Sequence, residues 1–281
     1  MIELSVTNAK NETLMLTGDE GKYQVINIEG LNPPETVVNL STIVGMDGAK
    51  LNSLRGDTRN IVITLKINGD VEQNRLALYQ YFPVKKTITL HFTTDSRSVD
   101  IEGVIDTFNC DLFTNSETAQ ISVICPYPFF KAVADDVFEL SGLTKLFKFP
   151  FAISSPIPMS EVAEQTAFEI VNQSSLETGI KAYILFNGTV EKVEITNNDQ
   201  TMTVNYSFIA NDELRIDTVR GEKSIKLTRA GTETNILSAM VGDFIQIVPG
   251  MNNVAFSFDD GESTSHISEA YFSFRKLYEA I

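Results

Sequence analysis

An alternation of apolar and polar residues runs through much of this chain and limits its fold more than any other feature. In residues 201–208, TMTVNYSF, every second side chain from Met202 to Phe208 is apolar or aromatic, and Thr, Asn or Ser stands between them. A strand with one buried face gives this pattern, because successive side chains point to opposite faces of a sheet. Residues 60–68 and 86–94 alternate in the same way. We therefore predict strands in all three segments.

Shorter runs of alternation predict many more strands. Turn dipeptides such as Asn187-Gly188, Arg220-Gly221 and Pro249-Gly250 separate several of them. Short strands at this density are typical of antiparallel sandwiches, so the predicted fold class is mainly β, with two β-sandwich domains. The further predicted strands lie at 24–30, 99–109, 119–125, 180–186, 190–196, 213–218, 223–228, 243–248, 253–258 and 270–274.

One segment has the helical period instead. Asp70 is a good N-cap for the segment that follows, and the apolar residues Val71, Leu78 and Phe82 lie on one stripe with Arg75. The next residue is proline, which ends a helix. We predict one amphipathic helix at 71–82, and a weaker helix at 160–165, SEVAEQ.

The stretch ISVICPYPFFKA, residues 121–132, breaks the strand pattern with an unusually apolar turn. Pro126 and Pro128 stop strand pairing, and Phe129 and Phe130 follow at once. The chain then has little periodicity up to about residue 161. We place a domain boundary here, giving domains 1–137 and 138–281, and interpret Pro126, Pro128, Phe129 and Phe130 as an anchor between the domains.

Composition and charge exclude several classes of protein. The net charge of −15 gives no basic face for gripping phosphates, so sequence-specific nucleic-acid binding is not expected. No stretch of about 20 apolar residues is present, and the first residues lack the basic start and apolar run of a signal peptide. Cys110 and Cys125 are interpreted as thiols that pack as small apolar groups; a disulfide would need neighbouring strands and an oxidising compartment.

The residues that usually carry chemistry are sparse. His91 and His266 are the only histidines, and no cysteine stands at zinc-ligand spacing from either. No phosphate-binding or dinucleotide-binding glycine motif and no nucleophile elbow is present, so we expect no cofactor and no enzyme activity. Runs of acidic and amide residues at 197–199 and 259–263 could hold calcium, but ordinary turn chemistry accounts for both.

An ordered set of small motifs spans almost the whole chain. The motifs are Tyr23 through Ile28-x-Gly30-Leu31-x-Pro33-Pro34, Asp47-Gly48, Arg59 before IVITLKI, Gly69-Asp70, Arg75-x-x-Leu78-Tyr79, KKTITLHF, Ile101-Glu102-Gly103, Gln120-Ile121-Ser122 running into Cys125-Pro126-x-Pro128-Phe129-Phe130, Phe168-x-Ile170-x-Asn172, Leu214-x-Ile216-Asp217-Thr218, Pro249-Gly250-x-Asn252 and Leu277-Tyr278-Glu279-x-Ile281. Each motif is weak alone, and the ordered set is specific. In this order the motifs resemble one family, the distal tail proteins (Dit) of siphophages, although Ala280 stands where the family pattern suggests glycine.

The resemblance implies a virion protein of the tail tip, assembled in the host cytoplasm. It implies a first β-sandwich domain with a helix and a long hairpin, a galectin-like second domain, and a homo-hexameric ring formed by the first domain. The ring would join the tail tube protein to the tail-tip protein, pass DNA through its channel, and could carry receptor-binding or side-fibre proteins. A closed ring needs two different complementary patches on each subunit. Asp47, Arg55, Arg59 and Arg75 are our candidates for that interface.

Two other functions stay open from the sequence. The second domain could be a carbohydrate-binding module for a host cell-surface glycan, although the chain has no tryptophan to stack on a sugar ring. A hydrolase of cell-wall polymers is the weaker alternative, since carboxylates are plentiful and no pair of them stands out.

Overall fold

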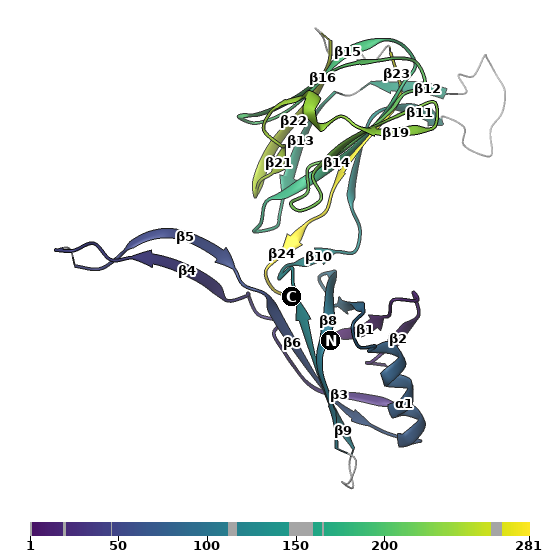
Figure 1. Cartoon of the computed structure of the whole chain (residues 1–281). Helices are drawn as coiled ribbons and strands as arrows, with labels where there is room; N and C mark the ends of the chain where they lie inside the picture. Colours follow the sequence, from purple (N-terminus) through teal and green to yellow (C-terminus); the bar gives the residue numbers. More distant parts are fainter. Residues whose placement is uncertain are drawn as a thin grey trace. The chain divides into compact units, whose positions relative to one another are not determined.

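The structure is a computed structural model that describes residues 2–18, 21–45, 47–111, 117–145, 160–164, 166–259 and 266–281, with backbone alone for 141–145 and 160–164. The alternating segments fold as strands, which divide into two units: Met1–Val133 with Leu277–Ile281, and Ala134–Lys276 (Figure 1). We had assigned residues 277–281 to the second domain. The structure places them in the first unit because their strand pairs with Phe130–Ala132.

The first unit is a long antiparallel sheet in the order β2-β1-β7-β8-β9-β6-β3, with β10 beside β8 and β24 beside β10. The predicted alternation in β6 is confirmed, since Ile61, Ile63, Leu65 and Ile67 are buried in one core. The sandwich-type, mainly β character of the chain is likewise confirmed. The strands of this sheet are β1 (Glu3–Thr7), β2 (Thr13–Met15), β3 (Tyr23–Glu29), β6 (Arg59–Ile67), β7 (Thr87–Thr93), β8 (Ser98–Cys110), β9 (Thr118–Cys125), β10 (Phe130–Ala132) and β24 (Leu277–Tyr278).

The predicted helix is present as α1 (Val71–Tyr81). The Asp70 carboxylate caps it by accepting a hydrogen bond from the Gln73 amide at 3.2 Å. Leu78 and Phe82 are buried in the core of the first unit. Leu76 and Tyr79 on the same helix are about half exposed.

The second unit is a sandwich of two sheets, in the orders β12-β11-β23-β14-β17-β18-β19 and β13-β22-β15-β16-β20, with β21 beside β14. Its core is rich in phenylalanine, and rings from the two sheets meet there: Phe186 stacks on Phe208 with ring centres 4.5 Å apart. Its elements are β11 (Asp136–Lys145), β12 (Ser160–Glu164), β13 (Ala167–Asn172), β14 (Thr178–Phe186), β15 (Val190–Asn197), β16 (Gln200–Phe208), β17 (Glu213–Asp217), β18 (Ser224–Arg229), β19 (Thr232–Asn235), the 3₁₀ turn η1 (Leu237–Ala239), β20 (Met240–Gly242), β21 (Gln246–Ile247), β22 (Gly250–Phe258) and β23 (Ile267–Phe274).

Two predicted elements differ from the structure. Residues 160–164 form strand β12 rather than a helix, because they pair antiparallel with β11 from Ser160 opposite Lys145 to Glu164 opposite Ser141. The strand predicted at 243–248 is reduced to β21, which pairs with the start of β14. Within the described residues, no helix has the length and apolarity that crossing a bilayer requires.

Both cysteines are free, although they lie on the neighbouring strands β8 and β9. Burial raises the pKa of the Cys125 thiol to about 12, and burial also raises the pKa of the Cys110 thiol. Since the thiolate is the reactive form, neither side chain is set up as a nucleophile. The interpretation of Cys125 as a small apolar core group agrees with its complete burial.

We expect Cys125 to resist alkylation in the folded protein. In a Cys110→Ser variant, which leaves one thiol per chain, iodoacetamide at pH 8 should label nothing until denaturant is added. Because the pKa of Cys125 is higher in the folded than in the unfolded chain, its protonated thiol stabilises the fold below about pH 9. This contribution is lost as the pH rises toward 12. Mass spectrometry of the labelled chain is the measurement, and rapid labelling of the native variant would contradict the prediction.

Candidate functional site

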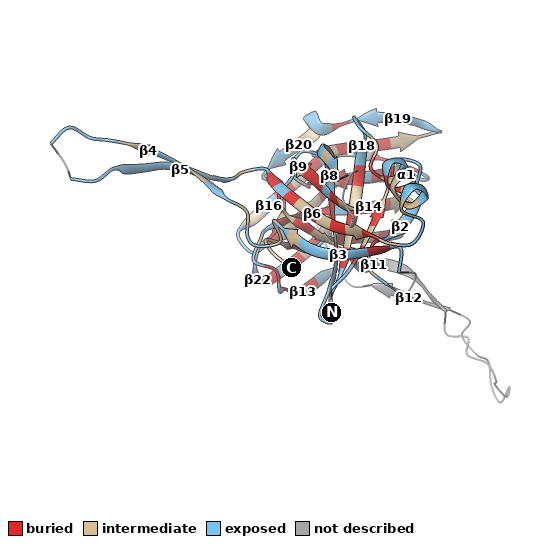
Figure 2. Ribbon diagram, turned by 90° about the horizontal axis from the view of Figure 1, so that it is seen from below, coloured by how far each residue is buried: buried red, intermediate tan, exposed pale blue. Residues whose placement is uncertain are grey.

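A hairpin of exposed residues leaves the sheet of the first unit between β3 and β6. It consists of β4 (Thr36–Ser41) and β5 (Lys50–Gly56), which pair only with each other, and we call it the arm (Figure 1). All of its residues that the structure describes are exposed or half-exposed, as the pale blue of Figure 2 shows. An isolated two-stranded hairpin is at best marginally stable in water. The arm is therefore suited to lie against another surface.

The apolar side chains of the arm come in cross-strand pairs. Val38 lies opposite Leu54, and Leu40 opposite Leu51, each between 50% and 58% exposed. Val44 at the end of the arm is fully exposed. Solvent-exposed apolar residues gathered on one element mark an interaction surface.

Two of the candidate interface residues lie on the arm. Asp47 is at its tip, and Arg55 lies on β5 opposite Val37. Both are exposed, and neither has a hydrogen-bond or ion-pair partner among the described residues. Both side chains are therefore accessible to a neighbouring chain.

Arg59 is placed quite differently from the prediction. Its side chain is only 3% exposed, and its guanidinium group donates four hydrogen bonds to backbone carbonyl oxygens at 2.5–2.6 Å. Burial lowers its pKa. The side chain uses four of its five hydrogen-bond donors within the first unit. It therefore links segments of its own unit and is not a surface residue open to a partner. The acceptors are the carbonyls of Gly30, Asn32, Pro128 and Glu279.

The four carbonyls come from three segments that meet where the arm joins the sheet. Gly30 and Asn32 lead into the arm, Pro128 follows β9, and Glu279 follows β24. Gly30 has a φ of +86°, and a Cβ atom there would lie 2.1 Å from the Asn60 carbonyl oxygen, so only glycine fits. Arg59 thus fixes the direction in which the chain enters the arm.

The predicted anchor residues surround the same point. Phe130 is completely buried in the core of the first unit, edge-on to Phe92 at 5.8 Å, and the Arg59 guanidinium lies 4.5 Å from its ring centre. Pro128 is buried and Phe129 half-buried, and both lie within 3.5 Å of a Cβ atom built on Gly56, the last residue of the arm. We call Arg59, Gly56, Pro128, Phe129 and Phe130 the arm root.

The role of these residues as an anchor between domains stays a prediction, and the structure shows their contacts within the first unit. Pro128, Phe129 and Phe130 support the arm and the core of the first unit, while Pro126 is exposed in the turn. The sequence signal for an apolar turn was sound, but residue type alone could not show which element the turn packs against.

Arg75 forms an ion pair on the surface of the first unit. Its Nη1 lies 3.0 Å from the Glu117 carboxylate, and both side chains are 18% exposed. Arg75 is therefore already paired within its own chain. Of the four candidate interface residues, only Asp47 and Arg55 lie together and exposed on one element.

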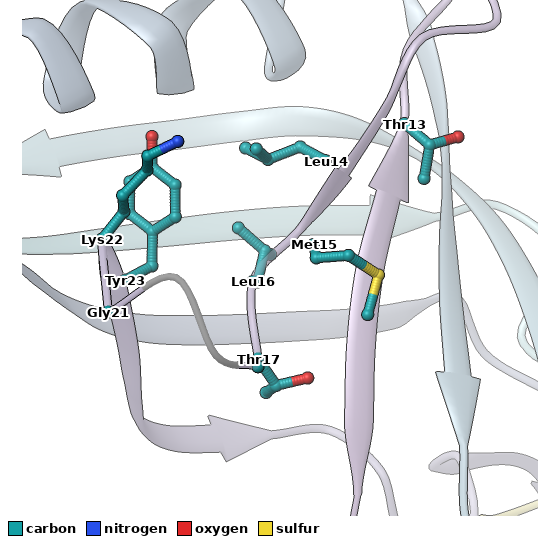
Figure 3. A pocket seen from close by; sticks show the side chains of 9 residues that line it. Thr13, Leu14, Met15, Leu16, Thr17, Gly21, Lys22 and Tyr23 are labelled. Atoms are coloured by element: carbon teal, nitrogen blue, oxygen red, sulfur yellow. The ribbon is translucent and has the colours of Figure 1, made fainter.

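A shallow groove of about 410 Å³ lies between β2 and the start of β3. In Figure 3, Leu14 points toward Tyr23, and Met15 points away from it. The Tyr23 hydroxyl donates to the Asn74 carbonyl oxygen on α1, and burial raises the pKa of this phenol. The described lining residues include no acid, histidine or cysteine, and the hydroxyl of Tyr23 is bonded to the Asn74 carbonyl oxygen.

A hydroxyl, an imidazole and a carboxylate do meet in a row on the first sheet. Thr7 Oγ1 lies 2.8 Å from His91 Nε2, and His91 Nδ1 lies 2.6 Å from Asp100 Oδ1. Hydrolases use such an order of groups together with backbone amides that bind the developing oxyanion. Here β1 and β7 pair on both sides, which commits the nearby amides to the sheet. The row links three neighbouring strands, β1, β7 and β8.

Metal-binding groups are not gathered in the described part of the chain, where no three His, Cys, Asp or Glu side chains lie close enough together to hold an ion. Asn198 takes a left-handed conformation in the turn at 197–199, with a φ of +50°. The other candidate calcium run lies, after Asp259, outside the described residues.

Comparison with known proteins bears on the identity of this fold. Residues 173–275, within the second unit, match the family model for the C-terminal domain of the siphovirus-type tail component SPP1_Dit. The chain also aligns with the crystal structure of the SPP1 Dit (gp 19.1) protein, a hub of the adsorption apparatus in phages that infect Gram-positive bacteria; the TM-score is 0.66 over 98% of each chain, at 11% identity. The second unit thus contains a Dit-type C-terminal domain, and the chain as a whole has the fold of the SPP1 Dit protein.

Two further structures have the same fold as this chain. They come from the activated baseplate of phage P2, with Ca and with Sr; the TM-scores are 0.56 and 0.55, over 100% of each chain, at 11% identity. No curated protein sequence matches the chain. The matched domain is that of a siphovirus-type tail component, in agreement with the resemblance of the chain's motifs.

Proposed function

We propose that this protein is the homo-hexameric hub that joins the tail tube to the tail-tip protein, with DNA passing through the central channel. The arm carries the proposal. It exposes paired apolar side chains on strands that have no other partner in the described chain, and a neighbouring copy would cover them. A ring needs an outgoing patch and a different receiving patch on each subunit, and a projecting arm is suited to be the outgoing one.

The charge of the chain is compatible with a conduit for DNA. A net charge of −15 gives the wall of a channel the same sign as the phosphate backbone, so DNA would pass without being held. The tail tube, the tail-tip protein and any receptor-binding or side-fibre proteins are the expected partners. The protein would act as a scaffold in the virion and catalyse no reaction.

A double substitution in the arm tests the hub proposal. We expect wild-type protein, alone or with its tail partners, to form sixfold rings in light scattering and negative-stain micrographs. Val38→Ser with Leu54→Ser should weaken assembly at least tenfold, since two apolar contacts are lost from the interface. The free energy of unfolding of the single chain should change by less than about 0.5 kcal/mol, because both residues are exposed in it.

A matched control is available on the second unit. Val171 and Met251 also form an exposed cross-strand apolar pair, at 56% and 61% exposure. Val171→Ser with Met251→Ser should leave the ring intact. A wild-type chain that stays monomeric even with its tail partners would refute the hub, and rings that tolerate the arm variant would refute the role of the arm.

A further inference from the structure

The outer face of the second unit carries an ordered group of side chains that the hub proposal does not use. Strand register places Tyr271, Tyr183 and Arg215 side by side on β23, β14 and β17. One step along the strands, Lys181 lies opposite Asp217. These residues line a groove of about 420 Å³, within the size range of small-molecule sites.

The two tyrosines form a stacked aromatic pair in this groove. Their ring centres lie 5.2 Å apart with an angle of 27° between the planes, so each ring covers part of one face of the other. The Arg215 guanidinium lies 5.8 Å from the Tyr183 ring centre and borders this pair. Burial raises the pKa of Tyr183, so its phenol keeps its proton at neutral pH and can both donate and accept. An aromatic face edged by hydrogen-bonding groups is suited to a ligand that has a flat apolar side and a polar rim.

The charges around the groove decide which ligand fits. Lys181 pairs with Asp217 at 3.1 Å and with Glu222 at 2.8 Å, and its hydrogen bond to Glu222 raises its pKa. Arg215 pairs with Glu213 at 3.1 Å. Lys226, the next residue in the row, pairs with Glu233 at 2.9 Å in the same way. Each cation is paired with a carboxylate. A phosphate-rich polymer would therefore gain little electrostatic attraction from the cations and would be repelled by the carboxylates.

We propose that this groove binds a neutral saccharide, with one pyranose face against the outer face of a ring in the Tyr183–Tyr271 stack and its hydroxyl groups on Lys181, Asp217 and Arg215. Sugar hydroxyls both donate and accept, so they can bond to either member of an ion pair without disturbing its charge balance. The proposal makes the outer sheet of the second unit a glycan-binding surface. It does not rest on the ring or on the arm.

Binding of the full-length chain to a panel of neutral oligosaccharides tests the proposal. The panel should span hexose, deoxyhexose and N-acetylhexosamine pyranosides, with poly(glycerol phosphate) as the anionic comparison. We expect saturable binding of at least one neutral member with a Kd of about 1 mM or tighter, measured by calorimetry. Saturation-transfer NMR should show the sugar ring protons, rather than a substituent, in contact with the protein.

Substitutions at the aromatic surface locate the site. Tyr183→Ala and Tyr271→Ala should each weaken binding at least tenfold, and Tyr183→Phe, which keeps the ring, should weaken it less. Tyr79→Ala removes a more exposed tyrosine that also packs on another ring, but on α1 of the first unit, and should have no effect. A panel without neutral binders, binding of the anionic polymer alone, or full affinity in the alanine variants would overturn the proposal. Ring formation, measured separately, distinguishes this failure from failure of the hub.

Discussion

Replacing Arg59 with methionine should destabilise the first unit by at least about 3 kcal/mol. The methionine keeps most of the length of the stem but removes all four donors, leaving the carbonyl oxygens of Gly30, Asn32, Pro128 and Glu279 without their partner. Unsatisfied buried acceptors carry the full cost of their lost hydration. Arg59→Lys should recover only part of the loss, since an ammonium group cannot reach acceptors in the spread geometry of a guanidinium.

Hydrogen exchange measured by mass spectrometry can assign the effect of Arg59→Met to a unit. Protection should fall in peptides from β6, β9 and β24 and stay unchanged in peptides from β14 and β23. Arg55→Met is the matched control, because Arg55 is four residues away and exposed, and we expect it to change stability by less than about 0.5 kcal/mol. Equal protection in Arg59→Met and wild-type protein would show that the four hydrogen bonds do not hold the arm root.

Truncating Phe130 to alanine should cost about 3–5 kcal/mol. The ring is fully buried, packs edge-on against Phe92, and lies under the Arg59 guanidinium. Its loss would leave a cavity in the core and remove a contact of the buried Arg59 guanidinium.

The labelling rate of Cys125 measures the opening of this unit when Cys110 is replaced by serine, because the Cys125 thiol is exposed to reagent only when the core opens. Its labelling rate should rise by about two to four orders of magnitude in Phe130→Ala.

The neighbouring Phe129 provides the control for Phe130. It is the same residue type at the next position, but it is only half-buried and contacts Tyr127 and the base of the arm. The fold increase in the labelling rate of Cys125 should be at least about ten times smaller in Phe129→Ala than in Phe130→Ala. Equal labelling rates in the two variants would mean that the core does not depend on Phe130.

Strands buried on one face could be predicted from the sequence, and strands without a buried face could not. The alternation in β6 and in β16 follows from a core on one side, and the helix was marked by Asp70 and by the proline after Phe82. Strands β4 and β5 have no buried face, so no period appeared in their sequence. Residues 160–164 have good helix formers, but pairing with β11 outweighs that local preference.

The candidate site was predictable in part, for a similar reason. Sequence position and residue type pointed to Arg59 and Phe130, but an arginine at the start of a strand is as consistent with a surface as with a core. The decisive partners are backbone carbonyls, including that of Glu279, which lies 220 residues away and leaves no side-chain signal. The tyrosine pair on the second unit was hidden because Tyr183 and Tyr271 become neighbours only through strand register.

The discontinuity of the first unit has a consequence for synthesis on the ribosome. Strand β24 and the Glu279 carbonyl are made only after the whole of Ala134–Lys276, while Arg59 is made 220 residues earlier. At ordinary elongation rates this delay is roughly 10–40 s. During that time the first unit must wait with its arginine only partly bonded, and the second unit also stays incomplete until β23 is made, because β23 lies between β11 and β14 in its sheet. A nascent chain interrupted inside the second unit would therefore lack a finished arm root.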